Sequence, residues 1–216
     1  MKKTLSLLSL VAAIVVMTAT GIYSSTSKTV GTAVIATKSD KQMGGGMAML
    51  LPEDLSTKQN MLLNTAYEIA KEDGHKNPEL LQGIILQETH AGGLKSYKVA
   101  GQEFGLKTGE RYYGVGQIKV SAALHVLGKY PEMWSDFNFQ TKTNDEVMAK
   151  LIENDKFNLA IASKYLKILK DDHGYKDDAS VAGAYNQGPT GAKTRVAEAQ
   201  RYANSVLNYM RKARSM

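Results

Sequence analysis

Apolar residues recur at a helical period along most of the chain that follows Ser56. The first stripe of such residues consists of Met61, Leu62, Ala66, Ile69 and Ala70. The same period predicts later helices over about 119–129, 144–153, 156–172, 178–187 and 195–212. Asp178 is the expected N-cap of the helix that starts there. We therefore expect a mainly α-helical domain over residues 56–216.

A further helix start stands at Asn77-Pro78-Glu79. This tripeptide offers a capping side chain, a proline at the first helical position and an acid in the first turn. Leucines and isoleucines continue the pattern as far as Glu88, and Gly92-Gly93 is expected to end the helix. Residues 101–118 interrupt the helical pattern with five glycines. They predict an irregular or short β segment with a turn at Thr108-Gly109.

Glu88 breaks an apolar stripe. Leu81, Ile85 and Glu88 are spaced by four and three residues, so they lie on one face of the predicted helix. A buried carboxyl group is costly to ionise, and burial therefore raises its pKa. A raised pKa is what a carboxylic acid needs in order to donate a proton near neutral pH. The more common case for such a pattern is a partly exposed glutamate beside a core stripe.

Two further segments place polar groups at turns or helix ends. Gly114-Val115-Gly116-Gln117 lies in the glycine-rich stretch, where glycines let the backbone approach a ligand and Gln117 can donate and accept hydrogen bonds. Ala184-Tyr185-Asn186-Gln187-Gly188-Pro189 ends a helix, with Tyr185 one turn after the apolar Val181. Taken singly, the two segments also fit a plain turn and a core tyrosine followed by an ordinary helix end.

Together the three segments resemble, in order and approximate spacing, the motifs of the lytic transglycosylases. Glu88-Thr89 is similar to that family's Glu-Ser, residues 114–117 to its Gly-Leu-Met-Gln, and residues 184–189 to its Ala-Tyr-Asn-Ala-Gly. The run from Asn158 to Leu166 resembles the helix between the second and third motifs, and the resemblance covers about residues 56–203. It implies a lysozyme-like, goose-type helical domain with a small irregular or β excursion.

The resemblance also implies an activity. Enzymes of this family cut the β-1,4 bond between N-acetylmuramic acid and N-acetylglucosamine in peptidoglycan, and they leave 1,6-anhydromuramyl ends without consuming water. Glu88 would be the single catalytic acid and base, which Tyr185 would hold in position. Thr89 would orient Glu88 or the acetamide of the substrate. Gln117 and the backbone around Gly116 would bind sugar.

The same comparison makes Asn186 a support for the wall of the substrate groove. The chain departs from the family pattern at three positions. Thr89 replaces serine but keeps the hydroxyl group, and Gln187 replaces alanine. Gly116 replaces methionine or a similar large residue, which predicts a more open groove wall at this point.

Other functions remain open on the sequence. A lysozyme-type hydrolase would need a second acid to activate water, at roughly 6.5–9.5 Å from the first if it inverts the sugar. Glu103 and Glu110 lie in the right general segment, but neither belongs to a recognisable motif. A non-catalytic peptidoglycan-binding module is a further alternative, and the glutamate at position 88 argues against it. The four histidines show no paired spacing, so we expect neither a metal nor another cofactor.

Composition narrows the choice of partners. The 27 Lys and Arg against 21 Asp and Glu give a formal net charge of +6, which suits an anionic partner such as bacterial wall polymer. The chain has no block of basic residues interleaved with aromatics, so we expect no binding to nucleic acid. The absence of cysteine from the sequence excludes a disulfide framework and a thiol nucleophile.

The N-terminal residues predict export. Lys2 and Lys3 precede an apolar run from about Leu5 to Met17, which is typical of a secretory signal peptide within residues 1–23. The alternative is an uncleaved membrane anchor formed by residues 4–23. Residues 24–55, rich in Ser, Thr, Lys and Gly, predict a flexible linker. We expect a location in the periplasm or cell envelope, where a cell, a phage, or a secretion or conjugation apparatus uses such enzymes to open the wall.

Overall fold

The fold of the domain is mainly helical, as the periodicity predicts. The computed structural model describes residues 55–94, 98–101 and 106–214. The expected signal segment and nearly all of the expected linker lie outside the described residues. Within the described ranges, no helix is both long and apolar enough to cross a membrane.

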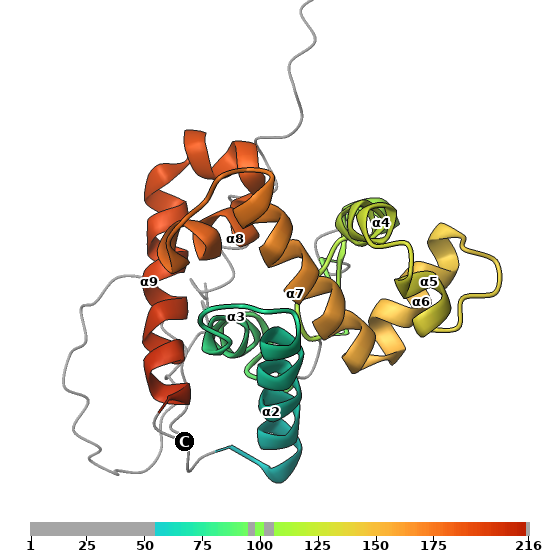
Figure 1. Cartoon of the computed structure of the whole chain (residues 1–216), viewed down its shortest axis with the longest axis horizontal. Helices are drawn as coiled ribbons and strands as arrows, with labels where there is room; N and C mark the ends of the chain where they lie inside the picture. Colours follow the sequence, from blue (N-terminus) through green and yellow to red (C-terminus); the bar gives the residue numbers. More distant parts are fainter. Residues whose placement is uncertain (1–54, 95–97, 102–105, 215–216) are drawn as a thin grey trace, which may run out of the picture. The chain divides into compact units, whose positions relative to one another are not determined.

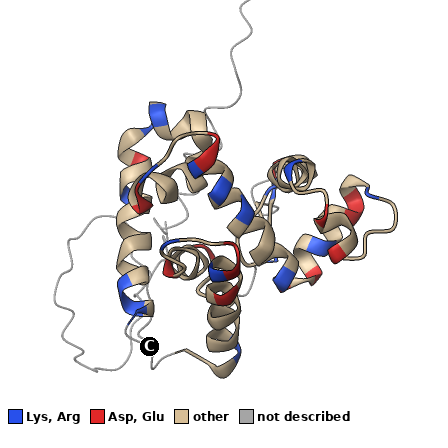
Figure 2. Ribbon diagram, in the orientation of Figure 1, with Lys and Arg blue, Asp and Glu red and all other residues tan. Residues whose placement is uncertain are grey.

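Eight α-helices follow one another in the part of the chain that the structure describes (Figure 1). They are α2 (Thr57–Glu72), α3 (Glu79–Thr89), α4 (Val120–Lys129), α5 (Met133–Asp136), α6 (Asn144–Glu153), α7 (Asp155–Asp171), α8 (Asp178–Thr194) and α9 (Val196–Ala213). Lys and Arg are spread over these helices and interspersed with Asp and Glu (Figure 2). The last turn of α9 carries a basic pair, Arg211 and Lys212.

The glycine-rich excursion between α3 and α4 contains the only strands of the described residues. Strand β1 (Val99–Ala100) pairs antiparallel with β2 (Tyr112–Tyr113), in the register Val99 to Tyr113. A single turn of 3-10 helix, η4 (Thr108–Glu110), covers the predicted turn. The prediction of a short β segment here is confirmed.

Most predicted helices lie within a residue or two of their observed ends, but two details differ. The four-residue α5 was not predicted, because one helical turn is too short to show a period. The helix expected over 178–187 ends as predicted, at a kink where Gly188 adopts a non-helical φ of 73°, but the range of α8 extends beyond this kink to Thr194. Pro189 then starts a second helical segment, which its restricted φ favours.

The predicted caps of α3 and α8 are wrong, and the two residues assigned to them bind each other instead. The side chain of Asn77 caps nothing; it donates a 2.6 Å hydrogen bond to the carboxylate of Asp178. The N-cap of α8 is Asp177, which accepts from the backbone N–H of Ser180 at 2.9 Å. Asn77 and Asp178 thus join the starts of α3 and α8, a long-range contact that local sequence does not reveal.

The buried face of α2 and the residues that end α3 differ from the prediction. In α2, Met61 is 65% exposed, and the buried face is formed by Leu63, Ala66, Ile69 and Ala70. Helix α3 ends before Gly92-Gly93, because His90 and Ala91 adopt left-handed conformations with φ of 49° and 53°. Such values are uncommon for residues other than glycine, so packing at the end of α3 holds them there.

Helix α3 is the most buried helix in the region around Glu88. Leu81 and Ile85 are both 0% exposed. Helix α3 lies between α2 and α9 (Figure 1), and its backbone approaches α9 most closely at Gly83. A Cβ atom at Gly83 would come within 2.7 Å of the carbonyl oxygen of Val206. Glycine at this position therefore sets the distance between α3 and α9.

This close approach predicts opposite effects for two helical Gly→Ala substitutions. Gly83→Ala is expected to destabilise the fold by about 1–3 kcal/mol, because the backbone of α9 must move. The matched control is Gly128→Ala in α4, where an added Cβ meets nothing within 4 Å. The control is expected to stabilise by about 0.5–1 kcal/mol through helix propensity. Urea unfolding measures both, and equal stabilisation in the two variants would refute the close contact.

Candidate active site

The last turn of α3 holds Glu88 against α9. The hydroxyl of Tyr202, from α9, donates a hydrogen bond of 2.5 Å to Oε1 of Glu88. Glu88 is half-buried: protein surrounds the carboxyl group, yet part of the residue still meets solvent. The side chain is therefore neither a core residue nor a free surface charge.

Burial raises the pKa of Glu88 from 4.5 to about 7. The main cause is the loss of water around the carboxylate, which destabilises the charged form. The hydrogen bond from Tyr202 acts in the opposite direction, because it stabilises the carboxylate. The group is consequently near half-protonated at neutral pH and can both give and take a proton.

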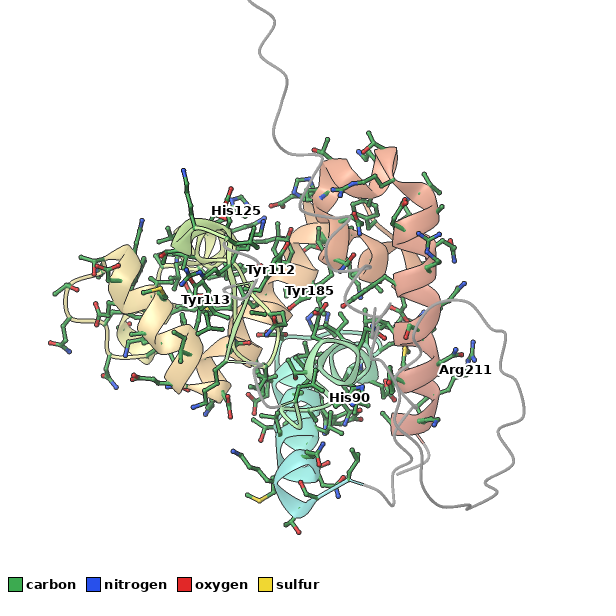
Figure 3. All side chains as sticks on the ribbon, turned by 180° about the vertical axis from the view of Figure 1, so that it is seen from behind. His90, Tyr112, Tyr113, His125, Tyr185 and Arg211 are labelled. Carbon is green, nitrogen blue, oxygen red and sulfur yellow. The ribbon has the colours of Figure 1, made fainter. Side chains whose placement is uncertain are left out.

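Three tyrosines from distant parts of the chain lie within electrostatic reach of Glu88. They are Tyr202 in α9, Tyr185 in α8 and Tyr112 in β2, the last two labelled in Figure 3. Burial is the main cause that raises the pKa of each phenol, and the negative charge of Glu88 raises it further. The phenols therefore stay neutral and remain hydrogen-bond donors around the carboxyl group.

Tyr185 binds the glycine-rich loop rather than Glu88. Its hydroxyl donates a 2.7 Å hydrogen bond to the carbonyl oxygen of Gly116. The sequence assigned the hold on Glu88 to Tyr185, whereas in the structure that hydrogen bond comes from Tyr202. Tyr185 also packs edge-on against Tyr165 of α7, with ring centroids 5.8 Å apart.

A buried asparagine in α7 holds the other side of the loop. Asn158 is 0% exposed, and its Oδ1 accepts from the N–H of Gly116 at 2.7 Å. Its Nδ2 donates to the carbonyl oxygens of Tyr113 at 2.8 Å and Leu151 at 3.0 Å. Its side chain thus joins the loop, through Tyr113 and Gly116, to the end of α6 at Leu151.

Glycine at position 116 does not open the groove wall as expected. A Cβ atom there would come within 2.9 Å of Oδ1 of Asn158 and 3.1 Å of the hydroxyl of Tyr185. The space that a side chain would need is already filled by these two groups. Gly116 is required for their approach to the backbone.

Thr89 ties the end of α3 to the same loop. Its hydroxyl donates to the carbonyl oxygens of Val115 at 3.0 Å and Ile85 at 3.2 Å, and it accepts from the N–H of Gly92 at 3.1 Å. Because Thr89 is 0% exposed, its contacts hold the loop and leave no hydroxyl facing a ligand in this structure.

The two predicted amide ligands lie on loop and helix ends. Gln117 adopts a φ of 50° and donates from Nε2 to the carbonyl oxygen of Gly114 at 2.8 Å. Asn186 is half-buried and accepts from Nε2 of the neighbouring Gln187 at 2.5 Å. Their contacts with sugar stay a prediction.

Sequence reasoning missed Tyr202, Tyr112 and Asn158. Tyr202 lies three residues after Ala199 and four before Val206, both buried, so helical spacing placed it on the inner face of α9. Asn158 interrupts a buried face just as Glu88 does, with Ile161 and Ala162 at three and four residues. The same test for polar residues on apolar stripes would have found both. Tyr112 had no comparable signal, because it lies in the irregular stretch.

No second acid is seen to act on Glu88 among the described residues. Glu110 is exposed and accepts from the N–H of Lys107 at the 3-10 turn, as expected for a solvated loop charge. Glu103 lies outside the described residues. Within the same ranges no group of three or more His, Cys, Asp or Glu side chains could hold a metal ion. His75 instead contacts Ser163, at 3.1 Å from its hydroxyl.

A hollow of about 580 Å³ lies elsewhere, beside α2, α5 and α7. Its lining includes Asp73, Met133, Asn154 and Lys164 and none of the residues around Glu88. Asp73 is already paired there with Lys164, at 2.6 Å. The perturbed carboxyl group and the three phenols instead mark the region of Glu88 as the candidate site.

Tyr202→Phe is expected to raise the pKa of Glu88 above 7, because it removes a donor that stabilises the carboxylate while burial remains. The measurement is a ¹³C NMR titration of the glutamate carboxyl groups. Tyr209→Phe is the matched control on α9, since its hydroxyl faces His90 at 3.4 Å instead. A pKa of Glu88 that is unchanged or lowered in Tyr202→Phe would contradict the assigned hydrogen bond.

The raised pKa of Glu88 also predicts how stability depends on pH. Between pH 4.5 and 7 the folded chain keeps a proton that the unfolded chain releases, so the contribution of Glu88 to stability falls as pH rises. Above pH 7, the stability lost through the raised pKa of Glu88 reaches about 3 kcal/mol. Glu88→Gln removes this titration and is expected to be more stable than wild type at about pH 8.5, with the gain shrinking towards pH 4.5. Urea unfolding at several pH values tests this, and a gain independent of pH would count against it.

Comparison of the chain with protein-family models, with curated proteins and with solved structures finds no significant match. The resemblance to lytic transglycosylases therefore rests on the three motifs alone, and the function must be argued from the geometry of Glu88 and its neighbours.

Proposed function

We propose that this chain is a peptidoglycan lytic transglycosylase with a lysozyme-like fold. It cleaves the β-1,4 bond between N-acetylmuramic acid and N-acetylglucosamine and leaves 1,6-anhydromuramyl ends. The observation that carries the proposal is a half-buried carboxyl group with a pKa of about 7, held by one phenol and surrounded by two more. An acid that must first donate a proton and later accept one works best when its pKa lies near the working pH.

The reaction uses one carboxyl group twice. Protonated Glu88 gives its proton to the oxygen that links the two sugars, and the bond from that oxygen to C1 of the muramyl residue breaks. The acetamide oxygen of the substrate stabilises the cationic centre at C1, as in substrate-assisted glycosidases. Ionised Glu88 then takes the proton from the C6 hydroxyl of the same sugar as that oxygen attacks C1. Glu88 ends protonated, and no water is consumed.

The neighbouring tyrosines support these steps by position. The hydroxyl of Tyr202 fixes Oε1 of Glu88 and, by stabilising the carboxylate, keeps the pKa from rising further. Tyr185 and Asn158 bind the carbonyl oxygen and the N–H of Gly116, so the loop is held in one conformation. A rigid arrangement of this kind lowers the entropy that the reaction must lose.

The environment of Glu88 favours transglycosylation over hydrolysis. A hydrolase places a second carboxylate near the first, and the repulsion between two such charges raises a pKa. The pKa of Glu88 is raised by burial, and no acidic side chain of the described residues is among its causes.

The proposed function also includes export of the protein to the periplasm or cell envelope. The N-terminal segment would serve as the signal peptide or as a membrane tether.

Digestion of purified peptidoglycan sacculi tests the reaction, with products identified by mass. Wild type is expected to release anhydro products, and Glu88→Gln is expected to lose at least ~100-fold in rate, because the amide cannot transfer the proton. Glu68→Gln is the control, since its side chain is 59% exposed on α2. Water-added reducing ends would assign the chain to the hydrolases. Full activity in Glu88→Gln would remove Glu88 from the mechanism.

A further inference from the structure

Two buried polar atoms beside the candidate site have no hydrogen-bond partner. They are Nη1 of Arg195, at the junction of α8 and α9, and Oε1 of Gln187, just before the bend in α8. One is a donor and the other an acceptor, yet they do not bond to each other. Buried polar groups are nearly always paired, so each of these two atoms requires a partner that the described residues do not supply.

Gly191 brings these two side chains together. A Cβ atom at Gly191 would come within 2.7 Å of Nη2 of Arg195 and 3.3 Å of Cβ of Gln187, so both side chains lie against this glycine. Nε2 of Gln187 is engaged with Oδ1 of Asn186, which leaves Oε1 as the open end of the amide. The guanidinium of Arg195 and the base of the Gln187 side chain thus lie on either side of Gly191.

Tyr112 lies within electrostatic reach of both the guanidinium of Arg195 and the carboxyl group of Glu88. The charge of Arg195 is not among the causes that shift the pKa of Glu88, so the guanidinium lies on the Tyr112 side of the candidate site. Lys119 adds a second cation, with Nζ 4.8 Å from the centre of the Tyr112 ring. Tyr112 therefore has one cation over its ring and a second within electrostatic reach, and these positive charges suit an anionic part of a substrate.

Gln187 is also one of the positions where the chain departs from the motif it resembles. Alanine at this position would offer no hydrogen-bonding group, whereas Gln187 supplies the unpaired acceptor. The unpaired acceptor is therefore a property of this chain and not of the motif that it resembles. It requires a ligand that provides an N–H for Gln187 together with an oxygen acceptor for Arg195.

We infer that Gln187 and Arg195, with Lys119 beside Tyr112, form a subsite for the stem peptide that hangs from the muramyl residue of the substrate. An amide N–H of the stem donates to Oε1 of Gln187, and a stem carboxylate accepts from the guanidinium of Arg195, whose planar fork matches a carboxylate. This inference rests on the proposed function. It deepens that function by making substrates with stems better than bare glycan strands.

The test compares two substrates and four proteins. The substrates are glycan strands with their stem peptides and the same strands after an amidase has removed the stems. The proteins are wild type, Arg195→Gln, Gln187→Ala and the control Arg201→Gln, whose side chain is 64% exposed on α9. The quantity measured is the ratio of kcat/KM on stem-bearing strands to kcat/KM on bare strands, with circular dichroism to check folding.

Wild type is expected to prefer stem-bearing strands. Arg195→Gln should lower the ratio by ~10-fold and Gln187→Ala by ~3-fold, since charged hydrogen bonds contribute more than neutral ones. Arg201→Gln should leave the ratio unchanged. Because each variant is compared with itself on two substrates, a general loss of activity or of folded protein cancels from the ratio.

The outcomes separate this inference from the proposed function. Anhydro products with an unchanged ratio in Arg195→Gln overturn the subsite and leave the transglycosylase intact. Water-added products with a lowered ratio support the subsite and refute the transglycosylase. Removal of the stem exposes the lactyl carboxylate of the glycan, so a larger loss on bare strands would make that carboxylate the ligand and overturn the assignment to the stem. Cleavage of neither substrate by wild type overturns both proposals.

Discussion

The free energy of ionising Glu88 in a half-buried position is the constraint on which the rest of the site depends. In water this carboxyl group would be charged and useless as a proton donor at neutral pH. Burial at the end of α3 raises its pKa to about 7, and the hydroxyl of Tyr202 limits that rise. The fold must therefore surround the carboxyl group of Glu88 with protein and supply one hydrogen-bond donor to it. Too little burial would leave a permanent anion, and no donor would leave an acid that cannot easily become a base.

Both requirements are met by packing between helices that are distant in sequence. Gly83 lets α3 approach the backbone of α9 closely, and Gly183 does the same for α8, where a Cβ would come within 3.0 Å of Ala199. Small residues at these crossings place Tyr202 within hydrogen-bond distance of Glu88. The site is thus a consequence of how near three helices can come to one another, rather than of any one segment.

The period of apolar residues predicted nearly every helix and singled out Glu88, because both depend on local spacing. Interactions between segments were not accessible in the same way. Asn77 was assigned to its own helix and in fact binds Asp178, and the hold on Glu88 was assigned to Tyr185 and in fact comes from Tyr202. The sequence placed Asn77 and Tyr185 at the correct ends of their helices. The partner of each depends on which helices pack together, and the period of apolar residues within one helix carries no information about that.

The departures from the family pattern differ in physical meaning, and only the structure separates them. At position 116 the space of a large side chain is filled by Asn158 and Tyr185, which bind the backbone N–H and carbonyl oxygen of Gly116. Thr89 keeps its hydroxyl and uses it fully within the protein. At position 187 the substitution adds a polar atom that the described residues leave unpaired. A change that the protein itself satisfies concerns folding, whereas a change that leaves a buried acceptor without a partner concerns what the site binds.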